Sequence, residues 1–241
     1  MTSPVRRPAF AVEACDCGAV RLRLAGLAAR LRPSGVLWLE DCGALVAADQ
    51  HLEKGSAFAA RGQLLPPYDT AETLARLAQE VAALDPARIV LLGDSFHDDR
   101  AEARLSPADA AAVASLARGR ELVWVVGNHD AEGPRALPGA VTAELEIGRL
   151  VLRHEPQDGP RAEAAGHLHP AAKVAGRGRT VRRRCFVTDG ERVVLPAFGA
   201  YAGGLNVRDA AFAGLFVRRP IVVTLGPRQA HAIGWSMLTG D

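Results

Sequence analysis

Apolar side chains recur along the chain with two distinct periods. Over residues 69–84 they are spaced three or four positions apart, which predicts an amphipathic helix. The apolar positions are Leu74, Leu77, Val81 and Leu84. Asp69 stands at the expected N-cap with Glu72 three residues later, and Pro86 follows the end of the helix. We therefore expect the apolar face of this helix to pack against a sheet.

Two apolar runs of strand length lie on either side of a second predicted helix. Residues 88–92 and 121–126 are almost continuously apolar, as in strands that are buried on both faces. Ser106 and Pro107 provide a cap and a first helical residue, and Gly119 ends the helix. The alternation of strands and helices predicts βαβ units with right-handed crossovers and a largely parallel sheet.

The other predicted strands have no helices between them. Residues 36–39 and 44–47 flank a turn and predict a hairpin, whose second strand leads directly into Asp49. In the second half of the chain the strand-like runs are residues 141–147, 149–153, 162–165, 180–187, 192–195 and 220–225. We therefore expect a second, mostly antiparallel sheet packed on the first.

Length and composition favour one large domain. The chain has 241 residues, of which 49% are hydrophobic, and this is enough for a sizeable core. We assign residues 35–241 to a single domain and residues 1–34 to a loosely ordered arm (1–17) followed by an edge strand (18–34). No run of about 18 apolar residues and no apolar signal-peptide region occurs, so we expect no membrane span and a cytoplasmic protein.

Basic residues are concentrated in one run. The net charge is only +2, which says little about partners, but all basic residues except Lys54 and Lys173 are arginine. The planar guanidinium suits phosphate, although a coding bias toward arginine would give the same excess. The run consists of Arg177, Arg179, Arg182, Arg183 and Arg184. Two interpretations are open, a patch that faces nucleic acid and the solvated face of a β-hairpin.

Potential metal ligands follow the predicted strands at the point where each strand ends. Carboxyl ends of strands in an open α/β sheet meet at one crevice, so residues far apart in sequence are expected to lie together there. Carboxylate, amide and imidazole groups in this number suit a centre that binds two divalent metals. The residues are Asp49, His51, Asp94, Asn128, His129, Asp130, His154, His167 and His169.

These residues form five blocks whose order is that of a known family. The blocks are Asp49-x-His51, Gly93-Asp94, Gly127-Asn128-His129-Asp130, His154 and Gly166-His167-x-His169. Over residues 46–170 the set resembles the calcineurin-like metallophosphoesterases. The resemblance implies an α/β fold of four layers, an αββα sandwich in which helices flank two mixed β-sheets.

The resemblance also implies a role for each residue. The first metal would be bound by Asp49, His51, Asp94 and His169, and the second by Asp94, Asn128, His154 and His167. His129 would remain outside the ligand sets and act as general acid, while Asp130 would hold its imidazole in position. Two cations would neutralise the phosphate oxygens and lower the pKa of a water. The mixed ligands favour Mn²⁺, with Fe or Zn²⁺ as alternatives.

One block departs from the family pattern. His97 stands where the common Gly-Asp-x-x-Asp block has its second aspartate. Either Asp98 or Asp99 takes over the supporting role of that aspartate, or His97 contacts the substrate; both interpretations are open. As residues that contact substrate we name His97, Lys54, Arg182, Arg183 and Arg184.

The sequence around these blocks also resembles one bacterial subgroup. Glu53-Lys54-Gly55-Ser56 and Gly93-Asp94-Ser95-Phe96-His97-Asp98 are similar to the phosphoesterases associated with an ATP-dependent DNA ligase and a helicase in DNA repair. This implies a Mn²⁺-dependent phosphodiesterase with DNA endonuclease activity, which is our main hypothesis. The alternatives are a phosphoesterase for nucleotides or cyclic nucleotides and, in another class, a non-catalytic scaffold of the same fold.

Overall fold

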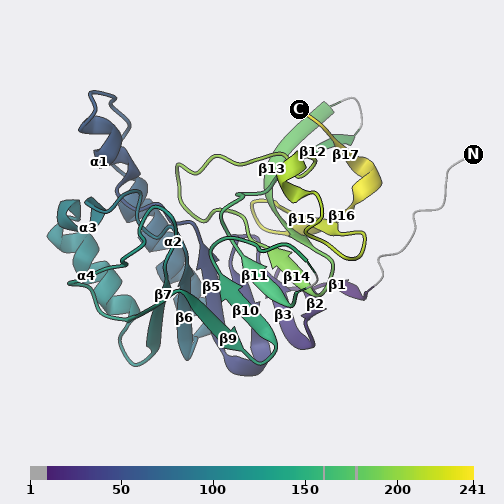
Figure 1. Cartoon of the computed structure of the whole chain (residues 1–241), viewed down its shortest axis with the longest axis horizontal. Helices are drawn as coiled ribbons and strands as arrows, with labels where there is room; N and C mark the ends of the chain where they lie inside the picture. Colours follow the sequence, from purple (N-terminus) through teal and green to yellow (C-terminus); the bar gives the residue numbers. More distant parts are fainter. Residues whose placement is uncertain (1–9, 160, 177–178) are drawn as a thin grey trace, which may run out of the picture.

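Two β-sheets packed face to face form the centre of the molecule, with helices against the first sheet (Figure 1). This computed structural model describes residues 10–159, 161–176 and 179–241. Both sheets contain parallel and antiparallel pairs, so the expected α/β class with two mixed sheets is confirmed. The α-helices in these residues are α1 (Lys54–Ala59), α2 (Asp69–Leu84), α3 (Ala101–Arg104) and α4 (Pro107–Leu116).

The first sheet has eight strands that follow one another in chain order. They are β1 (Val12–Ala14), β2 (Val20–Leu24), β3 (Leu27–Leu31), β4 (Leu37–Leu39), β5 (Ala44–Ala48), β6 (Arg88–Leu92), β7 (Glu121–Val125) and β8 (Ala140–Thr142). The pairs from β1 to β5 are antiparallel, which confirms the β4–β5 hairpin, and those from β5 to β8 are parallel. The parallel half of the sheet therefore places Asp49, Asp94 and Asn128 together, just beyond the carboxyl ends of β5, β6 and β7.

The second sheet runs in the order β16, β15, β13, β14, β11, β10, β9, and β12 and β17 extend it through β13. Its strands are β9 (Glu144–Ile147), β10 (Leu150–Arg153), β11 (Glu163–Ala165), β12 (Ala171–Gly176), β13 (Arg179–Thr188), β14 (Arg192–Val194), β15 (Ile221–Leu225), β16 (Ala230–Gly234) and β17 (Leu238–Thr239). Most pairs are antiparallel, as expected, and β10, β11 and β14 are parallel neighbours. We expected one strand over 141–147, but β8 pairs with β7 in the first sheet and only β9 belongs here.

Three apolar cores separate the layers. The first lies between the two sheets, and the second between the first sheet and helices α2 and α4. The third covers the outer face of the second sheet, where Phe212 of the 3-10 turn η2 (Ala210–Phe212) and Trp235 of η3 (Trp235–Met237) pack near Val187 and Val222. In the described part of the chain, these turns and the surrounding loops form the fourth layer in place of long helices.

Two expected helix caps have different outcomes. The Ser106 hydroxyl accepts a hydrogen bond from the Asp109 N–H at 3.1 Å, so α4 begins as expected. Asp69 is the first residue of α2 rather than its N-cap, and its carboxylate accepts a hydrogen bond from the Gly55 N–H at 2.9 Å. Asp69 therefore joins α2 to α1 instead of capping its own helix.

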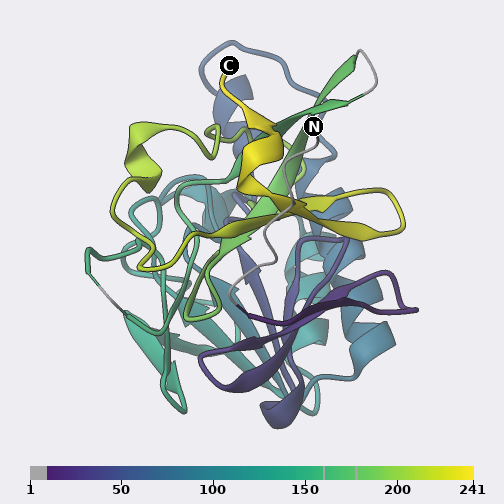
Figure 2. The same ribbon diagram turned by 90° about the vertical axis from the view of Figure 1, so that its right-hand side faces the viewer.

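The N-terminal strands are part of the first sheet. We expected one edge strand over 18–34, but this stretch contains the antiparallel pair β2 and β3, and β1 is the edge. Figure 2 shows these strands beside the β15–β16 hairpin, and the Ala230 N–H donates to the Gly18 carbonyl at 2.7 Å. Residues 1–9 of the expected arm lie outside the described residues. None of the described helices has the length and apolar character that a membrane crossing requires.

Candidate metal centre

The ends of five strands place the predicted ligands in one cluster. β5, β6, β7, β10 and β11 each lead into one of the blocks identified in the sequence. Five ligands have a positive φ, which non-glycine residues seldom adopt: Asp49 (52°), His51 (46°), Asp94 (42°), His167 (66°) and His169 (45°). Unfavourable backbone conformations concentrate at functional sites, because there they orient side chains that the site needs.

One group of side chains matches the predicted first ligand set. The His51 Nε2 lies 3.2 Å from the His169 Nε2. The same His169 atom lies 3.4 Å from Asp49 Oδ1, and the His51 Nε2 lies 3.9 Å from Asp94 Oδ2. Asp49, His51 and His169 thus each bring one donor atom within 4.8 Å of the others, and Asp94 lies beside His51.

A second group matches the other predicted set. Asn128 Oδ1 lies 2.8 Å from His154 Nε2 and 3.1 Å from His167 Nδ1. These two imidazole nitrogens are 3.1 Å apart, and the His154 Nε2 lies 3.4 Å from Asp94 Oδ1. Asp94 therefore presents one carboxylate oxygen to each set.

The two sets fit divalent metal ions. Imidazole nitrogens 3.1–3.2 Å apart have the separation expected of neighbouring ligands around one cation at about 2.1 Å. Burial, above all, lowers the pKa of His51 to about 2 and also lowers the pKa of His154. Both imidazoles are consequently neutral at physiological pH, which is the form that binds metal. Carboxylate, amide and imidazole donors together suit Mn²⁺, Fe and Zn²⁺.

Main-chain groups hold the two ligand carboxylates in place. The His129 N–H donates to Asp94 Oδ1 at 2.9 Å, and the His167 N–H donates to Asp49 Oδ2 at 3.1 Å. A Cβ at Gly127 would lie 2.2 Å from Asp94 Oδ1, and a Cβ at Gly166 would lie 2.4 Å from Asp49 Oδ2. These distances explain why glycine begins both blocks.

The whole chain is similar to a solved nuclease. The crystal structure of Pseudomonas putida nuclease MPE matches it with a TM-score of 0.68 and 28% identity, covering 89% of this chain and 100% of that one. This likeness agrees with the five blocks and the two ligand sets. The fold and the two ligand sets are consistent with a calcineurin-like metallophosphoesterase.

Two phosphoesterase structures are more distant from this chain. The E. coli phosphoesterase Yfce has a TM-score of 0.38 and 14% identity over 79% of this chain and 98% of that one. A predicted phosphoesterase from Streptococcus pneumoniae has a TM-score of 0.31 and 15% identity over 79% of this chain and 95% of that one. No protein-family model and no curated protein matches the sequence.

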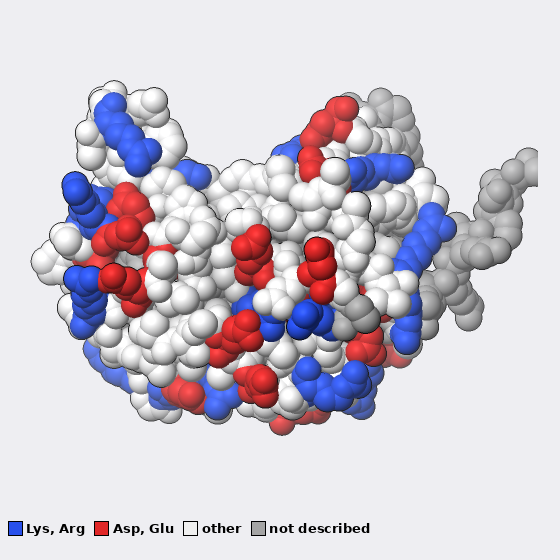
Figure 3. Space-filling view, in the orientation of Figure 1, with Lys and Arg blue, Asp and Glu red and all other residues white. Residues whose placement is uncertain are grey.

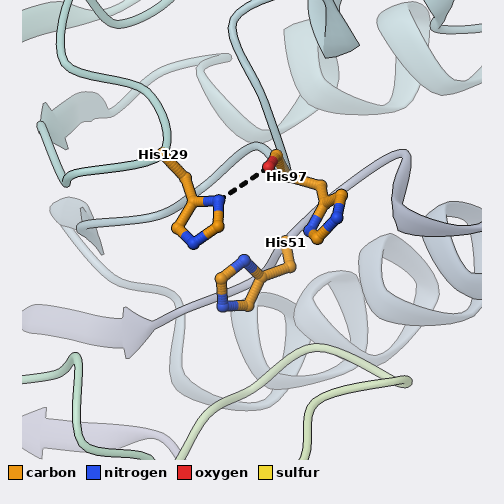
Figure 4. Close-up of side chains that lie close together, drawn as sticks. All are labelled: His51, His97 and His129. Atoms are coloured by element: carbon orange, nitrogen blue, oxygen red, sulfur yellow. Dashed lines mark hydrogen bonds between the residues drawn. The ribbon is translucent and has the colours of Figure 1, made fainter. Parts of the chain in front are cut away.

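His129 lies beside the first ligand set, outside both sets. Its Nε2 lies 3.9 Å from Asp94 Oδ2, and its Nδ1 lies 2.8 Å from the main-chain oxygen of His97 (Figure 4). A carbonyl oxygen only accepts hydrogen bonds, so Nδ1 carries the proton and Nε2 is the atom that faces the site. The His97 and His129 rings are stacked, with centroids 5.5 Å apart.

Asp130 has different partners from those we expected. Its Oδ1 accepts a hydrogen bond from the Gly127 N–H at 2.8 Å, and its Oδ2 accepts from the Ser95 N–H at 2.7 Å and from the Phe96 N–H at 3.1 Å. The carboxylate is thus occupied by three main-chain donors and does not contact the His129 imidazole. It joins the loops after β6 and β7, and the His97 carbonyl orients His129 instead.

The candidates for the aspartate replaced by His97 lie elsewhere. The Asp98 carboxylate pairs with Arg104 at 2.9 Å, which contributes to the lowered pKa of Asp98, and Asp99 is exposed. His97 is half-buried, and burial also lowers the pKa of its imidazole. Its ring lies 5.9 Å from that of His51, so His97 is at the rim of the first set.

The other expected substrate contacts lie around the centre rather than in it. The Lys54 Nζ donates to the Tyr201 carbonyl at 3.1 Å. Arg182 donates to the Gly204 carbonyl at 2.7 Å, and Arg183 is exposed on β13. Arg184 donates to the carbonyls of residues 197 and 199. Arg177 and the side chain of Arg179 lie outside the described residues.

The surface above the strand ends is hollowed. In Figure 1, α1 rises on one side of these strand ends and β12, β13 and β17 rise on the other. Figure 3 shows the depression between them. The residue types did not predict the contribution of the His97 carbonyl to this site, because a main-chain oxygen is present in every residue.

Proposed function

We propose that the protein is a dinuclear metal-dependent phosphodiesterase that cleaves DNA. The observation that carries this proposal is Asp94, whose two carboxylate oxygens face two complete ligand sets. Both sets consist of imidazoles with carboxylate or amide oxygens, a combination for which Mn²⁺ is the best fit. The complete sets also argue against a non-catalytic scaffold.

Two bound metals would supply Lewis acidity toward the phosphate and a water that is acidic at neutral pH. The residues of the chain position the reacting groups. In its doubly protonated form His129 would donate a proton from Nε2 to the leaving oxygen, while the carbonyl of His97, which accepts from Nδ1, fixes the orientation of the ring. The main-chain N–H groups of His129 and His167 keep the ligand carboxylates in position.

DNA is favoured over a small phosphoester by the comparison that covers the whole chain. The protein from Pseudomonas putida with that likeness is named a nuclease. The Glu53-Lys54-Gly55-Ser56 segment and the block around His97 also resemble the ligase-associated subgroup. We accordingly assign the chain to DNA repair in the cytoplasm, in functional association with an ATP-dependent DNA ligase and a helicase.

To test this proposal, purified protein with Mn²⁺ is incubated with an aryl phosphodiester and with circular DNA in single-stranded and plasmid form. We expect hydrolysis of the diester and nicking of the DNA, and loss of both in Asp94→Ala. If the diester or a nucleotide is hydrolysed while DNA stays intact at every Mn²⁺ concentration, the DNA assignment is wrong. If neither reaction occurs with any divalent metal, the scaffold interpretation replaces ours.

A further inference from the structure

A groove lined by arginines lies between α2 and β13. It has a volume of about 730 Å³, and its walls also include the β3–β4 turn and the loop after β15. The charged residues in its lining are Arg76, Glu80, Arg182, Arg183 and Arg184. None of these is a metal ligand, and the mechanism above does not use the groove.

Main-chain carbonyls hold two of the arginines. The Arg76 guanidinium lies 4.5 Å from the centre of the Phe198 ring and donates to the Phe198 carbonyl at 3.0 Å. Arg184 donates to the carbonyls of Ala197 at 2.8 Å and Gly199 at 3.3 Å. Burial lowers the pKa of both guanidiniums, and repulsion from Arg76 further lowers the pKa of Arg184. Two positive charges therefore lie close together at the groove.

Carboxylates balance this charge only in part, because Glu72 and Glu80 lie near Arg76, and Glu72 near Arg184, without forming an ion pair with them. Glu80 is paired with Arg32, which lies outside the lining. Arg182 lies 3.7 Å from the exposed carboxylate of Asp241. Among the described residues, Arg76, Arg183 and Arg184 have no carboxylate oxygen within 4 Å. Guanidinium groups that have only neutral partners attract phosphate, whose oxygens match their planar fork.

A single residue connects the groove to the metal centre. The Gly199 N–H donates to the main-chain oxygen of the ligand Asp49 at 3.1 Å, and the Gly199 carbonyl accepts from Arg184. A Cβ at Gly199 would lie only 2.2 Å from the Gln50 carbonyl oxygen, so the two segments are in close contact. A polyanion bound at the metals can therefore continue over this segment into the groove.

We propose that the arginine groove binds the phosphodiester backbone of the DNA strand beside the bond that is cut. This inference rests on the proposed function and adds a second contact region to it. Guanidinium contacts to backbone phosphates give affinity without sequence preference. The groove therefore favours long strands over small phosphodiesters.

The test uses Arg183→Gln, because Arg183 is exposed and makes no described ion pair, and the double variant Arg182→Gln/Arg183→Gln. Arg219→Gln is the matched control, since Arg219 is exposed and precedes β15 at the end remote from the groove. A labelled single-stranded oligonucleotide is titrated in the His129→Ala background, which prevents cleavage. Each lost phosphate contact should reduce the slope of log K against log salt by about 0.7 and weaken binding roughly threefold. In proteins that retain His129, the ratio of DNA cleavage to aryl phosphodiester hydrolysis should fall in the same variants.

The outcomes separate the two proposals. Equal affinities and salt slopes for Arg183→Gln, the double variant and Arg219→Gln would overturn the groove assignment and leave the proposed nuclease intact. If the parent protein hydrolyses the aryl diester but neither binds nor cuts DNA, the proposed DNA substrate fails and the groove assignment fails with it. Reduced binding confined to the groove variants supports both.

Discussion

The Nδ1 atom of His129 lies 2.8 Å from the main-chain oxygen of His97. This contact fixes the proton on Nδ1 and turns Nε2 toward the metal centre. The family pattern has an aspartate where this chain has His97, and here the main-chain oxygen of that residue is the acceptor for His129. The acceptor does not depend on the His97 side chain.

Variants at the two histidines should therefore differ. His129→Ala removes the proton donor and should lower kcat on diesters with poor leaving groups by about 10²–10⁴, with bound metal unchanged. His97→Ala keeps the carbonyl and loses only ring stacking, so its kcat should fall much less. The comparison uses an alkyl and an aryl diester, because a good leaving group needs no proton. Equal losses for both variants would contradict the role of the carbonyl.

Asp94 and His167 should have different effects on metal content. Asp94→Ala removes a ligand from both sets, whereas His167→Ala affects only the second set. Elemental analysis after reconstitution should show less than one ion per chain in Asp94→Ala and about one in His167→Ala. An Asp94→Ala protein with a full metal complement would exclude a shared carboxylate.

The stability of the metal-free protein should fall as the pH decreases from 7 to 5. Burial depresses the pKa of His51 to about 2 and lowers the pKa of His154, so below about pH 6.5 the unfolded chain binds protons that the folded chain does not. Each histidine adds a slope of up to about 1.4 kcal/mol per pH unit to the free energy of unfolding. Urea unfolding should show a smaller slope in His51→Gln than in the wild type, and no change in slope in the exposed control His231→Gln. Parallel wild-type and His51→Gln curves would show that His51 is not neutral in the fold.

Asp130 should act through structure rather than through His129. Its carboxylate accepts three main-chain hydrogen bonds. In Asp130→Asn the NH2 group of the amide, which is itself a donor, would face some of these N–H donors. We expect a loss of roughly 2–3 kcal/mol in the free energy of unfolding, and weaker metal binding, relative to the exposed control Asp99→Asn. The pH profile of kcat should keep its shape. A shifted profile with unchanged stability would instead favour a direct role toward His129.

The sequence predicted the elements that long apolar runs specify. Strands β5, β6 and β7 are buried on both faces, so their runs are continuous and the ligands at their ends can be recognised. β12 and β16 are no shorter but contain polar or small residues, because pairing with β13 and β15 rather than burial of their own side chains holds them in the sheet. The partners of Asp130 and the groove around Arg76 depend on how distant segments pack, and no local pattern encodes this.

The number of metal ions bound per chain tests the central claim most directly. Purified protein reconstituted with Mn²⁺ and freed of excess metal should hold two ions per chain by elemental analysis, and its phosphodiesterase activity should rise with the second ion. One ion per chain at full activity, or full activity after complete removal of metal, would contradict the dinuclear centre that Asp94 is proposed to bridge.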